Sequence, residues 1–327
     1  MMNAHYEYID RLKGLAIILV VMGHVLLYCC CSCDFPRAMA DFIGKGIYSF
    51  HMPLFMFLSG IVVSDFPHAA KLRRKLPQWL VPCVAIGLIY SFTIGDSVRS
   101  FVTNDFKGGY WYLFVLSEFY IFLAMGFLLP QRFRHHWLGQ ILLGGGIMVA
   151  LRVAVAFIPP TIVSTLSLNM AYGNWMYFFA GFFVRQHAKV LKFMCNDYVE
   201  PLFLVGIVAY FAFDLQVISR FFPFLPIGIL ICAFRRREQS GGFVNRQLSW
   251  IGKNTLYIYV LHYFLLSTVS LKLVYEPIVA THNFLAELLV ILAVSLVLAY
   301  VSACVGRILR SNRLLRLVLF GNALAPL

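Results

Sequence analysis

Runs of about twenty mainly apolar residues follow one another along this 327-residue chain, and they constrain its fold more than any other feature. A helix needs about twenty such residues to cross the hydrocarbon core of a bilayer. Hydrophobic residues make up 61% of the chain and charged residues only 13%, whereas soluble domains are about 45–50% apolar and about 25% charged. Lipid is therefore the expected solvent for most of the chain.

Ten of these runs are long enough to be membrane-spanning helices. Transmembrane strands are not expected, because segments such as residues 15–21 do not alternate between apolar and polar side chains. The intervening loops are too short for a soluble catalytic domain, so we predict an all-α polytopic membrane helical bundle that forms one domain over residues 1–327. The predicted spans cover residues 12–31, 42–63, 79–97, 110–129, 138–158, 170–186, 199–215, 217–234, 248–271 and 284–306.

The positive charges gather on one side of these predicted spans. The formal net charge is +13, and with a cytoplasmic N-terminus 20 of the 27 lysines and arginines fall in inner segments. Because cytoplasmic loops of membrane proteins are enriched in Lys and Arg, both termini are expected in the cytoplasm. The charge excess then records topology, and no nucleic-acid partner is expected.

Three histidines, His24, His51 and His262, are expected at similar depth inside the spans. Ionisable groups in a membrane are costly and are functional candidates by default, and a neutral imidazole can act as a general base near neutral pH. Lys13 precedes His24 by eleven residues, which places both on one helix face about 16 Å apart. Asp10 lies on the same face and can pair with Lys13. Alternatively, each histidine only bonds a neighbouring helix.

Four cations, Lys71, Arg73, Arg74 and Lys75, follow the second predicted span on its cytoplasmic side. Guanidinium groups fork onto phosphate oxygens, so this basic cluster suits a polyphosphate ligand. Its alternative role is to fix topology alone.

Other polar residues also mark the spans. Glu118 lies two turns inside the fourth span, and Asn254 with Thr255 is expected to cap the entry to the ninth. Metalloprotease, serine-esterase and nucleotide-binding motifs are missing from the sequence. The cysteines at the end of the first span lack the spacing of a zinc site, so neither a metal nor a permanently bound cofactor is expected. These cysteines are Cys29, Cys30, Cys31 and Cys33.

Five stretches of the chain resemble, in order, the motifs of the acyltransferase-3 family of bacterial integral-membrane acyltransferases. The resemblance covers nearly the whole chain, and the first, second and ninth spans carry its most specific parts. The stretches are Asp10-x-x-Lys13-Gly14 with Gly23-His24, Phe50-His51-Met52-Pro53 with Ser59-Gly60, the basic cluster with Lys71-x-x-Arg74 as the closest form of RxxR, Trp111-Tyr112-Leu113, and Ile251-Gly252-Lys253-Asn254-Thr255 with His262.

The resemblance implies an O-acetyltransferase of the bacterial inner membrane. Its co-substrate would be acetyl-CoA, and its acceptor a sugar hydroxyl in a surface polysaccharide or lipid-linked glycan. His24 would deprotonate the acceptor or carry the acetyl group, with Lys13 and Asp10 assisting, and the basic cluster would hold the CoA phosphates. Supporting roles are expected for Arg11, His51, Ser59, Trp111, Glu118, Asn254 and His262. Two alternatives stay open: a glycan or lipid transporter, and an acyltransferase with another donor such as succinyl-CoA.

Overall fold

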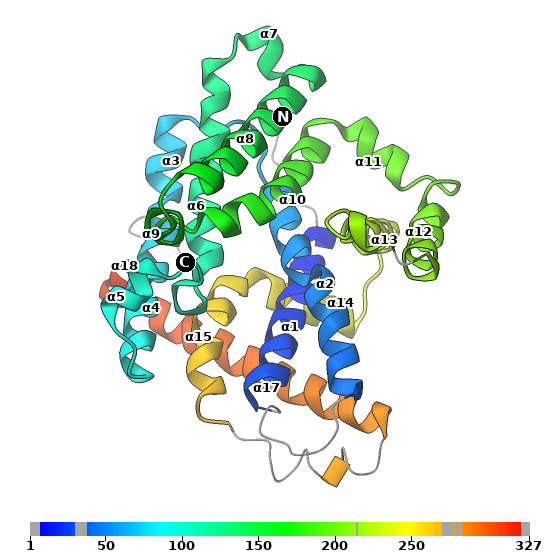
Figure 1. The fold of residues 1–327 in the computed structure, drawn as a ribbon. Coiled ribbons are helices and arrows are strands. Elements are labelled where there is room, and N and C mark those ends of the chain that lie inside the picture. The colour runs from blue at the N-terminus through cyan, green and yellow to red at the C-terminus, as the bar shows by residue number, and fades with distance from the viewer. Residues whose placement is uncertain (1–6, 30–37, 214, 270–276, 279–282, 322–327) are drawn as a thin grey trace. The chain divides into compact units, whose positions relative to one another are not determined.

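Helices are the only regular elements in the part of the chain that the computed structural model describes, namely residues 7–29, 38–213, 215–269, 277–278 and 283–321 (Figure 1). The all-α prediction is confirmed for these residues. The chain divides into two compact units. Unit 1 joins Met1–Phe55 to Lys192–Gly306, and unit 2 joins Met56–Leu191 to Arg307–Leu327.

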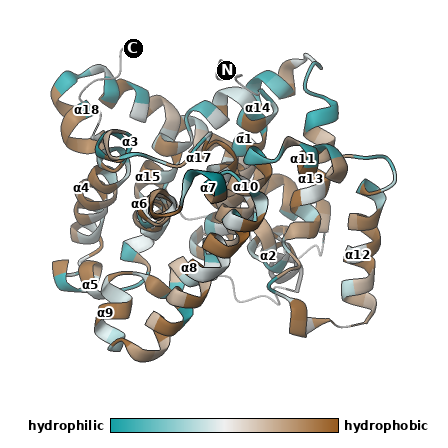
Figure 2. Cartoon of the chain, turned by 90° about the horizontal axis from the view of Figure 1, so that it is seen from above, coloured by the Kyte–Doolittle hydropathy of each residue, from teal (hydrophilic) through white to brown (hydrophobic). Residues whose placement is uncertain are grey.

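Several helices are suited to a membrane. Two shorter apolar helices, α12 (Glu200–Ala212) and α15 (Thr255–Leu266), also occur. Figure 2 shows the contrast between the mostly hydrophobic α12 and the more polar α14 (Phe243–Lys253). The number of ten spans and the cytoplasmic termini stay predictions. Among the described residues, five stretches are long and apolar enough to span: Glu7–Cys29, Ala69–Thr93, Trp111–Leu128, Trp137–Phe157 and Phe284–Ser311.

Unit 1 is organised around its first helix, which packs against α13, α14 and α15. Helices α1 and α14 approach closely where two glycines face backbone. A Cβ added to Gly14 would overlap the carbonyl oxygen of Leu248, and one added to Gly252 would overlap that of Asp10. The elements of unit 1 are α1 (Glu7–His24), the π-helix η1 (Val25–Cys29), most of α2 (Ala38–Ile61), α12, η4 (Gln216–Ile218), α13 (Phe224–Arg236), α14, α15 and most of α17 (Phe284–Ser311).

The predicted ninth span, residues 248–271, is divided into two helices at Asn254. The side chain of Asn254 does not cap α15, contrary to expectation. The amide Nδ2 instead donates to the carbonyl of Trp250 at 2.7 Å. The last carbonyls of a helix lack partners within the helix, so this side chain satisfies one at the end of α14 and holds the break between the two helices.

Unit 2 is built around α6, which packs against α4 and α10. A buried Trp175 ties α10 to α8 by donating from its indole nitrogen to the carbonyl of Gly144 at 2.9 Å. The elements are the end of α2, α3 (Ala69–Lys75), α4 (Pro77–Thr93), α5 (Val98–Thr103), η2 (Lys107–Gly109), α6 (Trp111–Ala124), η3 (Met125–Leu128), α7 (Gln131–Arg134), α8 (Trp137–Phe157), α9 (Pro160–Thr165), α10 (Leu168–Gln186), most of α11 (Ala188–Met194) and α18 (Arg313–Phe320).

Before α6, the Lys107 ammonium is buried and donates to the carbonyls of Val102, Asn104 and Ser164 at 2.7, 3.0 and 3.0 Å. An ammonium has three donors, and these bonds use all of them. Burial lowers the pKa of Lys107 below its usual value. Lys107 therefore fastens α5 and α9 together at the entry to α6.

Candidate active site

Two histidines that lie 238 positions apart in the sequence meet in unit 1. His24 is the last residue of α1, directly before the π-helix η1, and single turns of π-helix occur frequently at functional sites. Its Nδ1 lies 2.8 Å from Nε2 of His262, and the two ring planes are parallel to within 4°. His262 is completely buried in α15. The sequence predicts each histidine as a candidate, and the structure brings this pair together.

Each nitrogen of the histidine pair has a partner. Nδ1 of His262 lies 2.9 Å from the carbonyl oxygen of Ile258, one helical turn earlier in α15. On the other side, the hydroxyl of Tyr263 lies 3.3 Å from Nε2 of His24. Tyr263 had no signal of its own in the sequence, apart from its position next to His262. The pair is thus the centre of a chain of hydrogen bonds within unit 1.

His51, the third predicted histidine, also lies in unit 1 and is 3% exposed. Its Nδ1 lies 2.8 Å from the carbonyl oxygen of Ile47, again one turn earlier in its helix. The ring of Tyr48 stands edge-on against it, with the centroids 4.9 Å apart, and a Cβ on Gly23 would lie 3.3 Å from that same tyrosine. Tyr48 therefore links His51 to the turn of α1 before His24.

The start of α1 holds three of the predicted site residues. Nζ of Lys13 lies 4.0 Å from Oδ1 of Asp10, as their spacing predicts. Arg11 is buried and donates to the carbonyl of Arg237 at 2.9 Å, while it pairs with Glu7 at 3.0 Å. The C-terminal end of a helix carries partial negative charge, so the positively charged Arg11 fastens α1 to the C-terminal end of α13. Its contacts in this structure are those of a packing residue.

The basic cluster lies on α3 in unit 2, and helical geometry separates its members. At about 100° per residue, Lys71, Arg74 and Lys75 share one face, and Arg73 points to the opposite one. Both arginines are exposed. The spacing of the four cations in the sequence already separates Arg73 from the other three. This shared face therefore presents three of the four cations side by side.

The remaining predicted residues of unit 2 lie around α6. The hydroxyl of Ser59 is 2.6 Å from that of Tyr112, a contact between α2 and α6 that no sequence pattern indicates. Trp111 begins α6 and is partly buried. Glu118 buries its Oε2 with no hydrogen-bond partner in the described chain, and a buried polar atom without a partner is costly.

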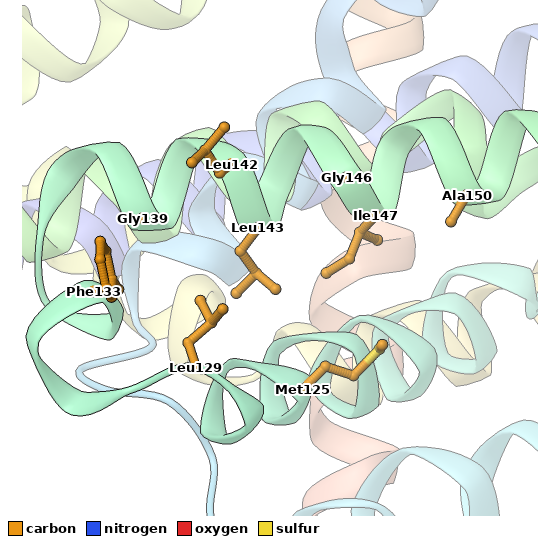
Figure 3. A pocket seen from close by; sticks show the side chains of 9 residues that line it. All are labelled: Met125, Leu129, Phe133, Gly139, Leu142, Leu143, Gly146, Ile147 and Ala150. Carbon is orange, nitrogen blue, oxygen red and sulfur yellow. The ribbon is translucent and has the colours of Figure 1, made fainter.

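Two cavities beside α8 differ in kind from the histidine site. One of about 370 Å³ is lined by apolar side chains such as Met125, Leu129 and Ile147 (Figure 3). A second, of about 330 Å³, lies between α8 and α10 and is also apolar. Because neither lining contains a group that exchanges protons, both suit hydrocarbon and neither is a candidate for the chemistry.

Metal ligands were not expected, and no group of three or more His, Cys, Asp or Glu side chains that could hold a metal is found where the structure describes the chain. Cys29 is buried, with Sγ 4.0 Å from the carbonyl of Leu266. Cys30, Cys31 and Cys33 lie outside the described residues.

Apolar helices of spanning length, together with a histidine pair of which His262 is buried, define a membrane protein with a candidate proton-accepting site. A family model described as an acyltransferase domain matches residues 6–304. The chain therefore belongs to the acyltransferase-3 family, as its motifs predict, and its class is that of the acyltransferases.

Similar curated proteins include two nodulation proteins called NolL. The one from Sinorhizobium fredii is 26% identical over 210 residues, covering 57% of this chain and 53% of that protein. The one from Mesorhizobium japonicum is 29% identical over 181 residues, covering 50% of this chain and 44% of that protein. The chain thus spans about half the length of the curated relatives it matches. No solved structure matches it.

Proposed function

We propose that this protein is an O-acetyltransferase of the bacterial inner membrane that moves an acetyl group from acetyl-CoA to a sugar hydroxyl. The acceptor is a surface polysaccharide or a lipid-linked glycan. Membership of the acyltransferase family supports acyl transfer. The observation that carries the proposal is the His24–His262 pair, with 2.8 Å between the two ring nitrogens, because transfer to a hydroxyl needs a base that removes its proton.

The proposed step uses His24 as the general base. The imidazole takes the proton of the acceptor hydroxyl while the hydroxyl oxygen attacks the thioester carbonyl carbon. A carbon–oxygen bond forms, the carbon–sulfur bond breaks, and the CoA thiolate leaves. The thiolate then receives the proton from His24, which restores the neutral imidazole. The products are an acetyl ester and free CoA, so atoms and charges balance.

The CoA phosphates are assigned to the shared face of α3, which Lys71, Arg74 and Lys75 form. A guanidinium binds phosphate through a planar fork, and a lysine binds it as a point charge. The proposal places this face in the cytoplasm, where acetyl-CoA is available, in agreement with the charge-based orientation. Arg73, on the opposite face of the helix, has no role in binding CoA.

The Arg74→Ala substitution should raise KM for acetyl-CoA about 10–100-fold, because a hydrogen bond to a charged group contributes about 1.5–3 kcal/mol. The value of kcat should stay near that of the wild type. Arg73→Ala is the matched control, since it removes an exposed arginine of the same short helix, and KM should be nearly unchanged. Initial rates of the purified protein at varied acetyl-CoA measure both constants. If both substitutions change KM equally, or neither changes it, the basic cluster serves only to fix the topology.

The activity itself is tested with purified protein, acetyl-CoA labelled in its acetyl group, and glycan from cells that lack the gene. We expect label on the glycan and release of CoA thiol in equal amounts. Mass spectrometry of surface glycans from cells with and without the gene gives the second readout, the mass of one acetyl group per modified residue. A succinyl mass instead would identify a different donor. An unmodified but mislocalised glycan would contradict acyl transfer and indicate that the protein is a transporter.

A further inference from the structure

We infer that His262 is a positioning residue that fixes the ring tautomer of His24, so that Nε2 of His24 is the atom that accepts the proton of the acceptor hydroxyl. The identity of that hydroxyl rests on the proposed function, whereas the tautomer rests on hydrogen-bond geometry within unit 1.

His262 is the neutral tautomer with its proton on Nδ1. A carbonyl oxygen accepts hydrogen bonds and cannot donate them. Because the carbonyl of Ile258 is 2.9 Å from Nδ1 of His262, that nitrogen carries a proton. The ring is completely buried, and no ion pair reaches it in the described part of the chain. Since an unpaired buried charge is very costly, His262 is neutral and carries no proton on Nε2.

The tautomer of His262 fixes that of His24. Nδ1 of His24 lies 2.8 Å from Nε2 of His262. Because that Nε2 carries no proton and can only accept, Nδ1 of His24 must carry the proton and donate it. A neutral imidazole has one donor and one acceptor nitrogen. Nε2 of His24 is therefore the acceptor, and the hydroxyl of Tyr263, 3.3 Å away, donates to it. Every hydrogen bond in this series then runs in one direction, from Tyr263 to the Ile258 carbonyl.

This arrangement prepares His24 for catalysis. A base is effective when a third group orients it, and His262 does so from a position set by its own helix turn. When Nε2 takes a proton, Nδ1–H continues to donate to His262, which stabilises the new imidazolium without a buried carboxylate. The Tyr263 hydroxyl lies in the direction of the Nε2 lone pair. When the acceptor binds, its hydroxyl occupies the position of the Tyr263 hydroxyl.

Two substitutions at one position test the role of His262. His262→Phe keeps a ring but removes the acceptor for Nδ1–H, and we expect kcat to fall about 10²-fold or more, within the range that general-base catalysis contributes. KM for acetyl-CoA should not change. His262→Gln supplies an amide oxygen that can accept the same proton, so it should recover much of the lost kcat. Equal activity of the Phe variant and the wild type, or no difference between Phe and Gln, would overturn the inference.

The tautomer is measured separately by ¹⁵N NMR of histidine-labelled protein, with the His24 signals assigned by their loss in His24→Gln. We expect a protonated Nδ1 and an unprotonated Nε2 in the wild type, and loss of this preference in His262→Phe. An unprotonated Nδ1 in the wild type would contradict the inference even if His24 is the base. Conversely, full activity of His24→Gln would refute the base while the NMR result still decides the tautomer.

Discussion

The His24→Ala substitution is expected to lower kcat for acyl transfer by about 10²–10⁴-fold, which is the usual contribution of a general base. The substitution removes both ring nitrogens, so the acceptor hydroxyl loses its base and His262 loses its partner at 2.8 Å. If His24 carries the acetyl group transiently, the loss is equally severe. Transfer of labelled acetyl groups by purified protein is the measurement.

Two further variants separate chemistry from folding. His24→Gln keeps a polar side chain of similar length, but its amide cannot accept a proton near neutral pH, so kcat should fall as far as in His24→Ala. His135→Gln changes an exposed histidine next to α7 and should leave kcat unchanged. Yield of membrane-inserted protein should be equal for all three. Wild-type turnover by a well-folded His24→Gln protein would refute the role of His24.

The membrane-spanning character of the chain could be predicted from the sequence because it depends on local composition. The runs at 110–129, 138–158 and 284–306 correspond to long apolar helices of the structure. The run at 248–271 does not, because hydropathy is insensitive to the single hydrogen bond from Asn254 to Trp250 that ends α14. A local bond between side chain and backbone decides that boundary.

The candidate site could be predicted residue by residue, but its pairs could not. His24 and His262 were identified because ionisable groups are costly inside a membrane. Their pairing is a contact between distant segments, and it depends on how closely α1 approaches α14 and α15. Gly14 and Gly252 permit that approach, and a glycine in a sequence does not tell which backbone it will face. The opposite orientation of Arg73 was predictable, because helical spacing alone separates it from Arg74.

The Gly252→Ala substitution is expected to destabilise unit 1 more than the addition of a methyl group at any of its other glycines. The new Cβ would overlap the carbonyl oxygen of Asp10, which is backbone and cannot turn aside. Overpacking of a core costs about 1–3 kcal/mol and occasionally more, and we expect the upper end because two helices must separate. The thermal unfolding midpoint of the detergent-solubilised protein should fall, and turnover should fall with it.

Gly46→Ala is the matched control for this change. Gly46 lies inside α2 with nothing within 4 Å of an added Cβ, and alanine is favoured over glycine in helices by about 1 kcal/mol, so the midpoint should stay or rise. Because α1 ends at His24 and α14 leads into the helix of His262, a shift at Gly252 displaces both members of the histidine pair. A Gly252→Ala protein with a normal midpoint but lost turnover would show that the close crossing serves the position of the pair more than stability. Normal values of both would mean that the two helices do not cross at these glycines.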